Sequence, residues 1–391
     1  MLRSLYSGIS GLRSHQEMLD VTGNNIANVN TVGFKASSTV FQDTLSQMTQ
    51  GAGGPQTGVG GTNPAQIGLG VQVAGVSTNF AQGSAQATGK ATDLMISGDG
   101  FFVTRLGNDT VYTRAGAFDF DADGRLVSSD GKIVQGYPAT NGVVNDGGQL
   151  TDIVLPLDAA TPAVKTSAAA VTGNLPSETA VGDTITRDAT VYDANGAKHT
   201  LSLAYTRTAD GWNVEAKDGQ GTTATSSISF GTDGAIASGG TVAVGGITVD
   251  MSELTGFAAL NTSSIASQNG HEAGSLQGYS ISKDGTVVGT FSNGASLAIG
   301  RIALATFANP AGLEKTGASG YRATGNSGQA SIGAPGSAGV GQLASGTLEM
   351  SNVDLSQEFT NLIVAQRGFQ ANARIITTSD EVLQELTNLK R

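Results

Sequence analysis

Apolar residues recur every seven positions at both ends of the chain, and this pattern constrains the fold more than any other feature. The N-terminal row is Leu5, Leu12, Leu19 and Ile26, and the C-terminal row is Leu355, Leu362, Phe369, Ile376 and Leu383. A strict seven-residue apolar period predicts a helix whose stripe packs against another helix. We call these two rows the assembly seam. The chain is expected to leave one helix and return to a second, so the two can pair antiparallel.

The long middle of the chain has strand-like alternation and little charge. Glycine makes up 56 of 391 residues, about twice the usual share. Asx-Gly pairs between apolar runs are strong hairpin signals, and they occur at 123–124, 130–131, 195–196, 210–211, 233–234, 284–285 and 293–294. The sequence therefore predicts a multi-domain, mainly β protein with nested β domains, whose N- and C-terminal α-helices form a coiled-coil-like terminal domain.

Shifts in composition divide the chain into nested parts. We expect a helical domain from 1–34 and 352–391, an extended connector at 35–70, a β domain from 71–156 and 275–345, and an inserted outer β domain at 157–274. The inserted domain is bordered by a Pro- and Ala-rich stretch at 156–171 and a polar, Gly-rich stretch at 261–274. Such stretches are typical of domain boundaries.

Local signals refine the two predicted helices. Ser351 with Asp354, just before Leu355, resembles a capping box at the start of the second helix. Lys390 and Arg391 would suit its negative C-terminal end. Gly8, Gly11 and Gly23 weaken the first helix, each by roughly 1 kcal/mol relative to alanine.

Composition excludes several classes of function. The net charge of −11 argues against a general nucleic-acid binder, and the absence of cysteine excludes disulfides, thiol catalysis and cysteine zinc sites. The sequence contains no run of 18 apolar residues, so no segment is expected to span a membrane. The N-terminus lacks the unbroken apolar core of a cleaved signal peptide. The protein is therefore either cytoplasmic or exported by a route that does not cleave a signal.

A search for chemistry finds no phosphate-binding, dinucleotide-binding or nucleophile-elbow motif. His271-Glu272 begins like a zinc-protease motif, but Ser275 stands where the second ligand would be. A serine-histidine-aspartate triad need not be visible in sequence, but nothing indicates one. We expect no catalytic residue, no cofactor, no metal and no enzymatic activity.

Two further features allow a functional or a structural interpretation. Asp119, Asp121, Asp123, Gly124 and Asp130 follow the spacing of a calcium loop. Strand-like residues flank this segment where helices would be needed, so a hairpin turn is favoured. The single tryptophan, Trp212, could stack on a ligand, but a core position is the simpler expectation.

Both ends of the chain resemble one family. SLYSGISGLRSHQEMLDVTGNNIANVNTVGFK at 4–35 and SNVDLSQEFTNLIVAQRGFQANARIITTSDEVLQELTNLKR at 351–391 are similar to the ends of flagellar rod and hook axial proteins. GDGFFV at 98–103, YTRAGAFDFDADGRLVSSDG at 112–131 and VQGYPA at 134–139 resemble the β domain that the family shares. The stretch 191–219 resembles the outer domain of the hook members.

The resemblance implies a self-assembling structural subunit of the bacterial flagellar hook. Terminal helices would line the inside of a curved helical tube made of many copies, which acts as a universal joint between rod and filament. Implied partners are the rod, hook cap and hook–filament junction proteins and the flagellar type III export apparatus. The resemblance also implies that the protein is exported without signal cleavage and lies outside the cell, in the flagellum. Phe41 and Leu45 fit the family's export motif, although an amphipathic turn explains these two residues equally well.

Other functions stay open at this stage. A distal rod protein of the same family is one alternative, although the inserted domain favours the hook. A secreted β-rich adhesin or carbohydrate-binding module and an exported hydrolase are alternatives of different classes. Neither would use apolar seven-residue rows at both ends of the chain.

Overall fold

The computed structural model describes residues 2–55, 57–58, 60–140, 142–156 and 161–388. The chain divides into two compact units. The first comprises Met1–Leu155, Ser280–Val288 and Ala298–Arg391, and the second comprises Pro156–Tyr279 and Gly289–Leu297. The predicted domain border at 157 and the Lys390–Arg391 helix end lie outside the described residues.

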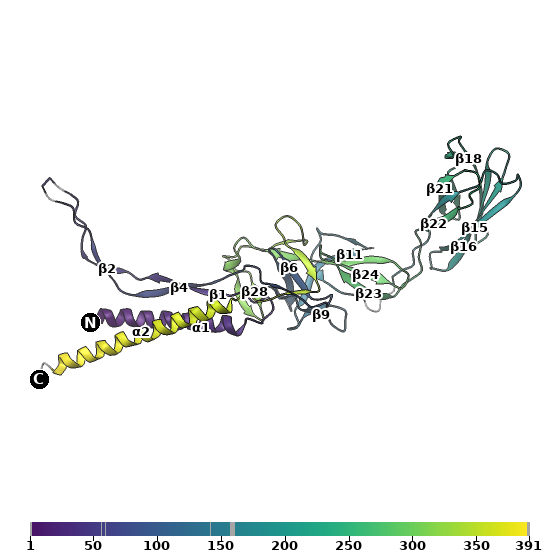
Figure 1. Ribbon diagram of the computed structural model, residues 1–391. Coiled ribbons are helices and arrows are strands. Elements are labelled where there is room, and N and C mark those ends of the chain that lie inside the picture. The colour runs from purple at the N-terminus through teal and green to yellow at the C-terminus, as the bar shows by residue number, and fades with distance from the viewer. Residues whose placement is uncertain (1, 56, 59, 141, 157–160, 389–391) are drawn as a thin grey trace. The chain divides into compact units, whose positions relative to one another are not determined.

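Two helices occupy the ends of the first unit. Helix α1 spans Leu2–Ala27 and helix α2 spans Leu355–Asn388. Figure 1 shows them side by side, with the N and C ends of the chain at the same end of the pair. The sequence placed both helices correctly, but the cap of α2 differs from the expectation. Asp354 is the capping residue, because its Oδ1 accepts hydrogen bonds from the backbone N–H groups of Ser356 and Gln357.

The segment after α1 forms two antiparallel ribbons. Strand β1 (Ser37–Asp43) pairs with β4 (Val71–Thr78), and β2 (Ser46–Gln50) pairs with β3 (Ala65–Gly68). Both β1 and β4 pack against α1. The predicted extended connector is therefore organised as paired strands in this part of the chain.

The β body of the first unit is built from short antiparallel strands. They are β5 (Ala85–Ala87), β6 (Leu94–Ser97), β7 (Phe101–Leu106), β8 (Asp109–Thr113), β9 (Phe118–Phe120), β10 (Leu126–Ser128), β11 (Ile133–Thr140), β12 (Val143–Val144), β13 (Thr151–Asp152), β26 (Leu304–Thr306), β27 (Glu314–Gly317), β28 (Gly320–Arg322), β29 (Ser331–Gly333), β30 (Gln342–Ser345) and β31 (Thr347–Glu349). A short 3₁₀ helix, η1, spans Pro310–Gly312. Three further strands contain residues of both units: β23 (Leu276–Ile281), β24 (Thr286–Phe291) and β25 (Ser296–Ile302).

Aromatic side chains fill one core of this body. Phe101, Tyr112, Phe307 and Tyr321 are buried together, and Phe80 packs against them. Their rings meet edge to face or tilted, with centroids 4.8–5.8 Å apart, which is the favoured range for aromatic pairs. This core fixes strands β7, β8 and β28, and Arg114 of the site described below follows directly after β8.

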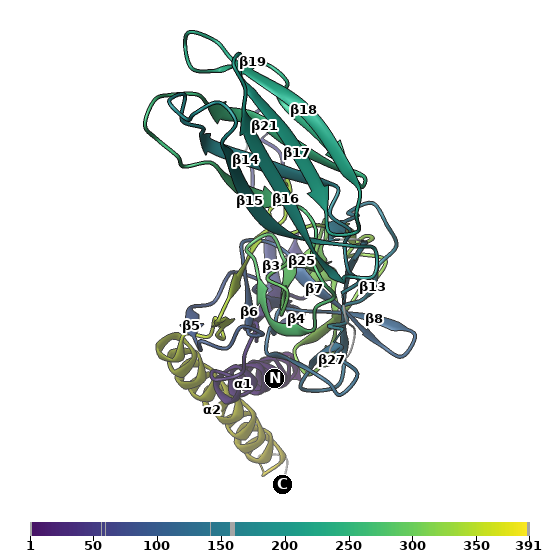
Figure 2. The same cartoon turned by 90° about the vertical axis from the view of Figure 1, so that its right-hand side faces the viewer.

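The second unit packs two sheets around its own core. Strands β15 (Thr184–Tyr192), β16 (Lys198–Arg207), β17 (Trp212–Asp218), β18 (Thr223–Phe230) and β19 (Ile236–Ser238) form one sheet in sequence order. The other sheet has the order β20 (Thr241–Val244), β21 (Ile247–Thr255), β14 (Ala168–Asn174) and β22 (Ser264–Gln268). Figure 2 shows β15 to β18 lying side by side. Trp212 is 1 % exposed in the core between the sheets, as the sequence predicted.

Candidate assembly site

The two helices contact each other in one antiparallel register, which includes small, polar and apolar residues. Gly8 of α1 lies against Ile375 and Ile376 of α2, and Gly11 lies against Asn372. Further along, His15 lies against Gly368 and the Asn25 side chain donates to Glu358 Oε1 at 3.0 Å. As the position in α1 rises, the position of its contact in α2 falls, so the two helices are antiparallel. The sequence predicted this, because the chain begins with one helix and ends with the other.

Glycine allows the close approach at this contact. A Cβ atom on Gly11 would lie 2.8 Å from the Asn372 side chain, and one on Gly368 would lie 2.5 Å from the His15 ring. The His15 ring also meets the Phe41 ring edge-on, with centroids 6.0 Å apart. Glycine at these places thus allows the helices to approach, besides weakening them.

The assembly seam overlaps this contact, since its member Ile376 lies against Gly8. Leu5, Leu12, Leu19 and Ile26 of α1 are half-buried, as are Leu362, Phe369 and Ile376 of α2, while Leu355 and Leu383 are exposed. Within one chain the seam is therefore covered only in part. Its role between chains stays a prediction.

Helix α2 keeps a broad apolar surface that the chain itself does not cover. Phe359, Ile363, Val364, Val382 and Leu386 are 47–53 % exposed. Exposed apolar surface of this extent on one helix indicates an interaction site.

The predicted export motif lies on the first ribbon. Phe41 belongs to β1 and is 37 % exposed, and Leu45 is 85 % exposed between β1 and β2. Phe41 lies in a paired strand and not in the amphipathic turn that was the alternative interpretation. The role of both residues in export stays a prediction.

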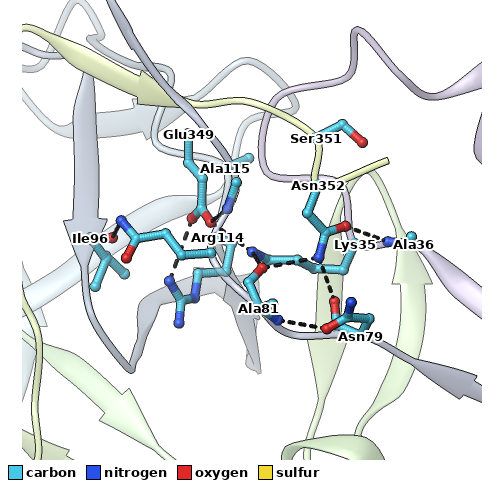
Figure 3. A network of polar contacts seen from close by, with 12 residues as sticks. Lys35, Ala36, Asn79, Ala81, Ile96, Arg114, Ala115, Glu349, Ser351 and Asn352 are labelled. Carbon is cyan, nitrogen blue, oxygen red and sulfur yellow. Dashed lines mark hydrogen bonds and ion pairs between the residues drawn. The ribbon is translucent and has the colours of Figure 1, made fainter. Parts of the chain in front are cut away.

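A buried ionic cluster joins both terminal segments to the β body (Figure 3). Lys35 and Glu349 have fully buried side chains, and Lys35 Nζ lies 2.6 Å from Glu349 Oε1. Arg114 Nη1 lies 3.4 Å from Glu349 Oε2 and is also buried. Lys35 further donates to the Ala81 carbonyl at 2.7 Å. Burial lowers the pKa of the Lys35 ammonium, and its bond to Glu349 opposes this shift.

Hydrogen bonds to backbone groups also hold this junction together. Asn352 Oδ1 accepts the Ala36 N–H, and Asn352 Nδ2 donates to the carbonyls of Asn79 and Ala81. The Gly33 N–H donates to the Glu349 carbonyl. Gly33 has φ of +66°, and a Cβ there would lie 2.5 Å from the Ala115 nitrogen, so only glycine fits.

Sequence reasoning missed this cluster. Its members are 314 and 235 residues apart in the chain, and no short motif links them. The only sequence signal for these three residues is that charged residues are scarce, at 14 % of the chain, so each one stands out.

The aspartate-rich segment is a hairpin turn, as predicted. Strand β9 pairs antiparallel with β10 across it. Asp121 Oδ1 accepts the N–H groups of Asp123 and Arg125, and Asp121 Oδ2 accepts Arg125 Nε at 2.8 Å. Both oxygens of the Asp121 carboxylate therefore accept hydrogen bonds from residues of the turn itself. In the described part of the chain, no three metal-ligating side chains come together and no helix is long and apolar enough to cross a membrane.

Three segments match known families. Residues 5–35 match the family described as "Flagella basal body rod protein", residues 95–168 match "Flagellar hook protein FlgE/F/G D1 domain", and residues 344–389 match "Flagellar basal body rod FlgEFG protein C-terminal". The terminal matches include most of α1 and all of α2, and the central match includes Arg114.

Full-length relatives carry hook and rod names. The chain is 39 % identical to the flagellar hook protein FlgE of Borreliella burgdorferi, with all of both chains covered. It is 36 % identical to FlgE of Salmonella typhimurium, covering 99 % of this chain and 100 % of that protein. It is also 36 % identical to the flagellar basal-body rod protein FlgG of Bacillus subtilis, again with both chains fully covered. Coverage alone therefore does not separate hook from rod proteins.

A solved structure shares the fold. The Helicobacter pylori flagellar hook protein FlgE2 matches with a TM-score of 0.52 at 14 % identity, covering 68 % of this chain and 100 % of that one. The chain therefore belongs to the flagellar rod and hook protein family, and it is a structural protein of the flagellum.

Proposed function

We propose that the chain is the subunit of a flagellar hook, in which many copies form a curved helical tube. This tube passes torque from the rod to the filament as a universal joint. The observation that carries the proposal is the similarity to hook proteins along the whole chain. The exposed apolar surface of α2 supports it, since a subunit of a tube needs faces that only other copies cover.

The proposed roles of the parts follow from this arrangement. The helical domain of 1–34 and 352–391 lines the tube, and the β domains form outer layers. The assembly seam contributes to continuous apolar contacts between copies. Contacts between polar, Gly-rich outer surfaces can shift at a small cost in free energy, so the tube bends while it turns.

Export and partners belong to the same proposal. The chain leaves the cell unfolded through the flagellar type III apparatus, without signal cleavage, and Phe41 and Leu45 act in recognition. Once outside, it contacts the rod, the hook cap and the hook–filament junction proteins. The absence of cysteine suits a chain that folds after export.

Electron microscopy of the purified protein tests the proposal, with curved tubes expected. Leu362→Asp should stop tube growth, because an unpaired carboxylate in an apolar contact costs a few kcal/mol in every copy. Thr378→Asp, at an exposed polar position of α2, is the matched control and should leave tubes intact. Normal tubes from Leu362→Asp would contradict the seam.

A distal rod protein is the second candidate, favoured by the similarity to the Bacillus subtilis rod protein. Complementation separates the two functions. The gene should restore swimming to a strain that lacks its hook protein and should fail in one that lacks its distal rod protein. The reverse result would support the rod.

A further inference from the structure

A groove lies between helix α1 and the β27–β28 hairpin. Its volume is about 530 Å³. Val21, Phe34, Val76 and Tyr321 give it apolar walls, and all of these residues belong to the first unit. A groove of this size and lining is typical of a binding site.

The two ends of the groove differ in charge. Glu17 and Asp20 are exposed on α1 at one end and form no ion pair within the described residues. At the other end Lys315 Nζ donates to Ser37 Oγ at 2.8 Å and lies 5.4 Å from the centre of the Phe34 ring. Burial lowers the pKa of this Lys315 ammonium. The groove is therefore acidic at one end and apolar with a partly buried cation at the other.

Helix α2 carries the complementary pattern on its exposed face. Phe359 and Ile363 are 52 % and 51 % exposed. Arg367 follows at the next turn on the same face, and Arg374 lies two turns further on. Both arginines are exposed and form no ion pair in the part of the chain that is described. From Phe359 to Arg367 the helix rises by about 12 Å, which equals the rise of α1 from Glu17 to Asn25.

One chain cannot bring these two surfaces together. Helices α1 and α2 already contact each other through Gly11 with Asn372 and His15 with Gly368. That contact uses the face of α2 that buries Ala365, and the arginines lie on an exposed face. The occupant of the groove must therefore come from another chain.

We propose that the groove binds the Phe359–Arg374 face of α2 from a second copy of this chain. This inference rests on the proposed self-assembly and names one of its interfaces. Phe359 and Ile363 fill the apolar end, Arg367 pairs with Glu17 and Asp20, and Arg374 adds positive charge beyond this acidic end. Lys315 sets the direction, because the reversed helix would place arginines beside its positive charge. Groove and helix are different surfaces, so the contact is heterologous and propagates from copy to copy.

Charge reversal tests the pairing. Glu17→Lys with Asp20→Lys should reduce the sedimenting tube fraction more than tenfold, since like charges across an interface cost several kcal/mol. Arg367→Glu with Arg374→Glu should do the same. An equal mixture of the two variants should assemble, because every groove then meets a helix of opposite charge. Glu178→Lys with Asp183→Lys, at exposed acids of the second unit, is the control and should assemble normally. Circular dichroism of each variant separates loss of assembly from loss of folding.

Cross-linking gives an independent measurement. The chain has no cysteine, so Asp20→Cys with Arg367→Cys introduces the only thiols. Oxidised tubes should give a ladder of covalent oligomers, and Asp20→Cys alone should give only monomer. A covalent dimer from Asp20→Cys alone would overturn the docking, since it would show α1 facing α1.

The results also separate this inference from the proposed function. Wild-type tubes, together with normal assembly of both charge-reversed variants and no ladder, would overturn the docking and leave the hook function intact. Wild-type protein that forms no tubes would contradict the proposed function itself.

Discussion

At the scale of single residues, the buried charges at the junction carry the largest energetic consequences. Glu349 accepts from Lys35 Nζ and from the Gly83 N–H with the same oxygen, while its other oxygen faces Arg114. Transferring ions into a protein interior costs several kcal/mol each, and only close pairing offsets this cost. The cluster therefore holds the terminal segments to the β body only while all of its members are present.

Glu349→Gln should lower the free energy of unfolding by roughly 3–5 kcal/mol, because it leaves two buried cations without a counter-charge. Urea denaturation of the full chain measures this loss. Glu178→Gln, at an exposed glutamate, is the control and should change stability by no more than about 0.5 kcal/mol. Wild-type stability in Glu349→Gln would show that the charges are not paired as described.

Asp193 makes the β15–β16 turn sensitive to acid. Its Oδ1 accepts the N–H groups of Asn195 and Ala197, each at 2.8 Å. The Ala197 N–H is the main cause that lowers the pKa of Asp193; slight burial opposes it, and Asn195 and His199 add to the lowering. The folded-state pKa lies below the unfolded value of about 3.9. The unfolded state therefore binds the proton more readily, and this stabilisation is lost as pH falls through the folded-state pKa.

Asp193→Asn should therefore remove part of the acid sensitivity. The variant should be less stable than wild type at pH 6, and the difference should shrink as pH falls below about 4. Urea titrations at a series of pH values measure this. A difference that stays constant down to pH 3 would contradict the role of the Asp193 charge.

At the scale of elements, small residues decide how the two helices pair. Gly11 and Gly368 allow side chains of the opposite helix to reach the backbone, whereas Gly23 has nothing within 4 Å of its Cβ position. The same residue type therefore has opposite effects on stability within one helix pair.

Gly368→Ala should destabilise the protein by about 1–3 kcal/mol, because the added methyl group displaces a His15 ring that is held against Phe41. Gly23→Ala should stabilise it by about 0.5–1 kcal/mol, since alanine favours an exposed helix interior. Thermal unfolding followed by circular dichroism at 222 nm measures both. Equal effects of the two substitutions would show that the helices do not approach closely at Gly368.

The sequence predicted those elements that depend on neighbouring residues. The seven-residue rows indicated both helices, because they mark one apolar face along a helix. The Asx-Gly pairs indicated the turns at 121–124 and 193–196, because these residues suit the backbone of tight turns. Asp354 replaced Ser351 as the cap for an equally local reason, since its carboxylate reaches the N–H groups of the first turn.

The rest of the site depends on contacts between distant segments. The close approach of the helices occurs at Gly8, Gly11 and Gly368, and only the packed structure shows which residues of the opposite helix these glycines face. The Lys35–Glu349–Arg114 cluster could not be found from sequence, because the folded body brings together residues from both ends and the middle of the chain.

At the scale of the whole molecule, the first and last segments of the main part of the second unit, Pro156–Tyr279, are paired by isolated backbone bridges. The backbones of Val164 and His271 exchange two hydrogen bonds, at 2.9 and 3.0 Å, and those of Thr161 and Gly274 also pair. The segments 161–164 and 271–274, near the two ends of Pro156–Tyr279, therefore lie next to each other, as expected of a domain inserted into another. A short link can replace everything between them.

Replacing residues 165–270 with Asn-Gly should therefore leave the first unit folded, because a two-residue turn can join the paired residues Val164 and His271. We expect the variant to form tubes, since α1, α2 and the groove beside α1 all lie in the first unit. The tubes should be straighter than those of the wild type, because contacts between outer domains that favour one curvature are removed. Electron microscopy of isolated hooks measures both properties. A folded variant that forms no tubes would show that the second unit is needed for assembly, and unchanged curvature would show that the shape is set by the first unit alone.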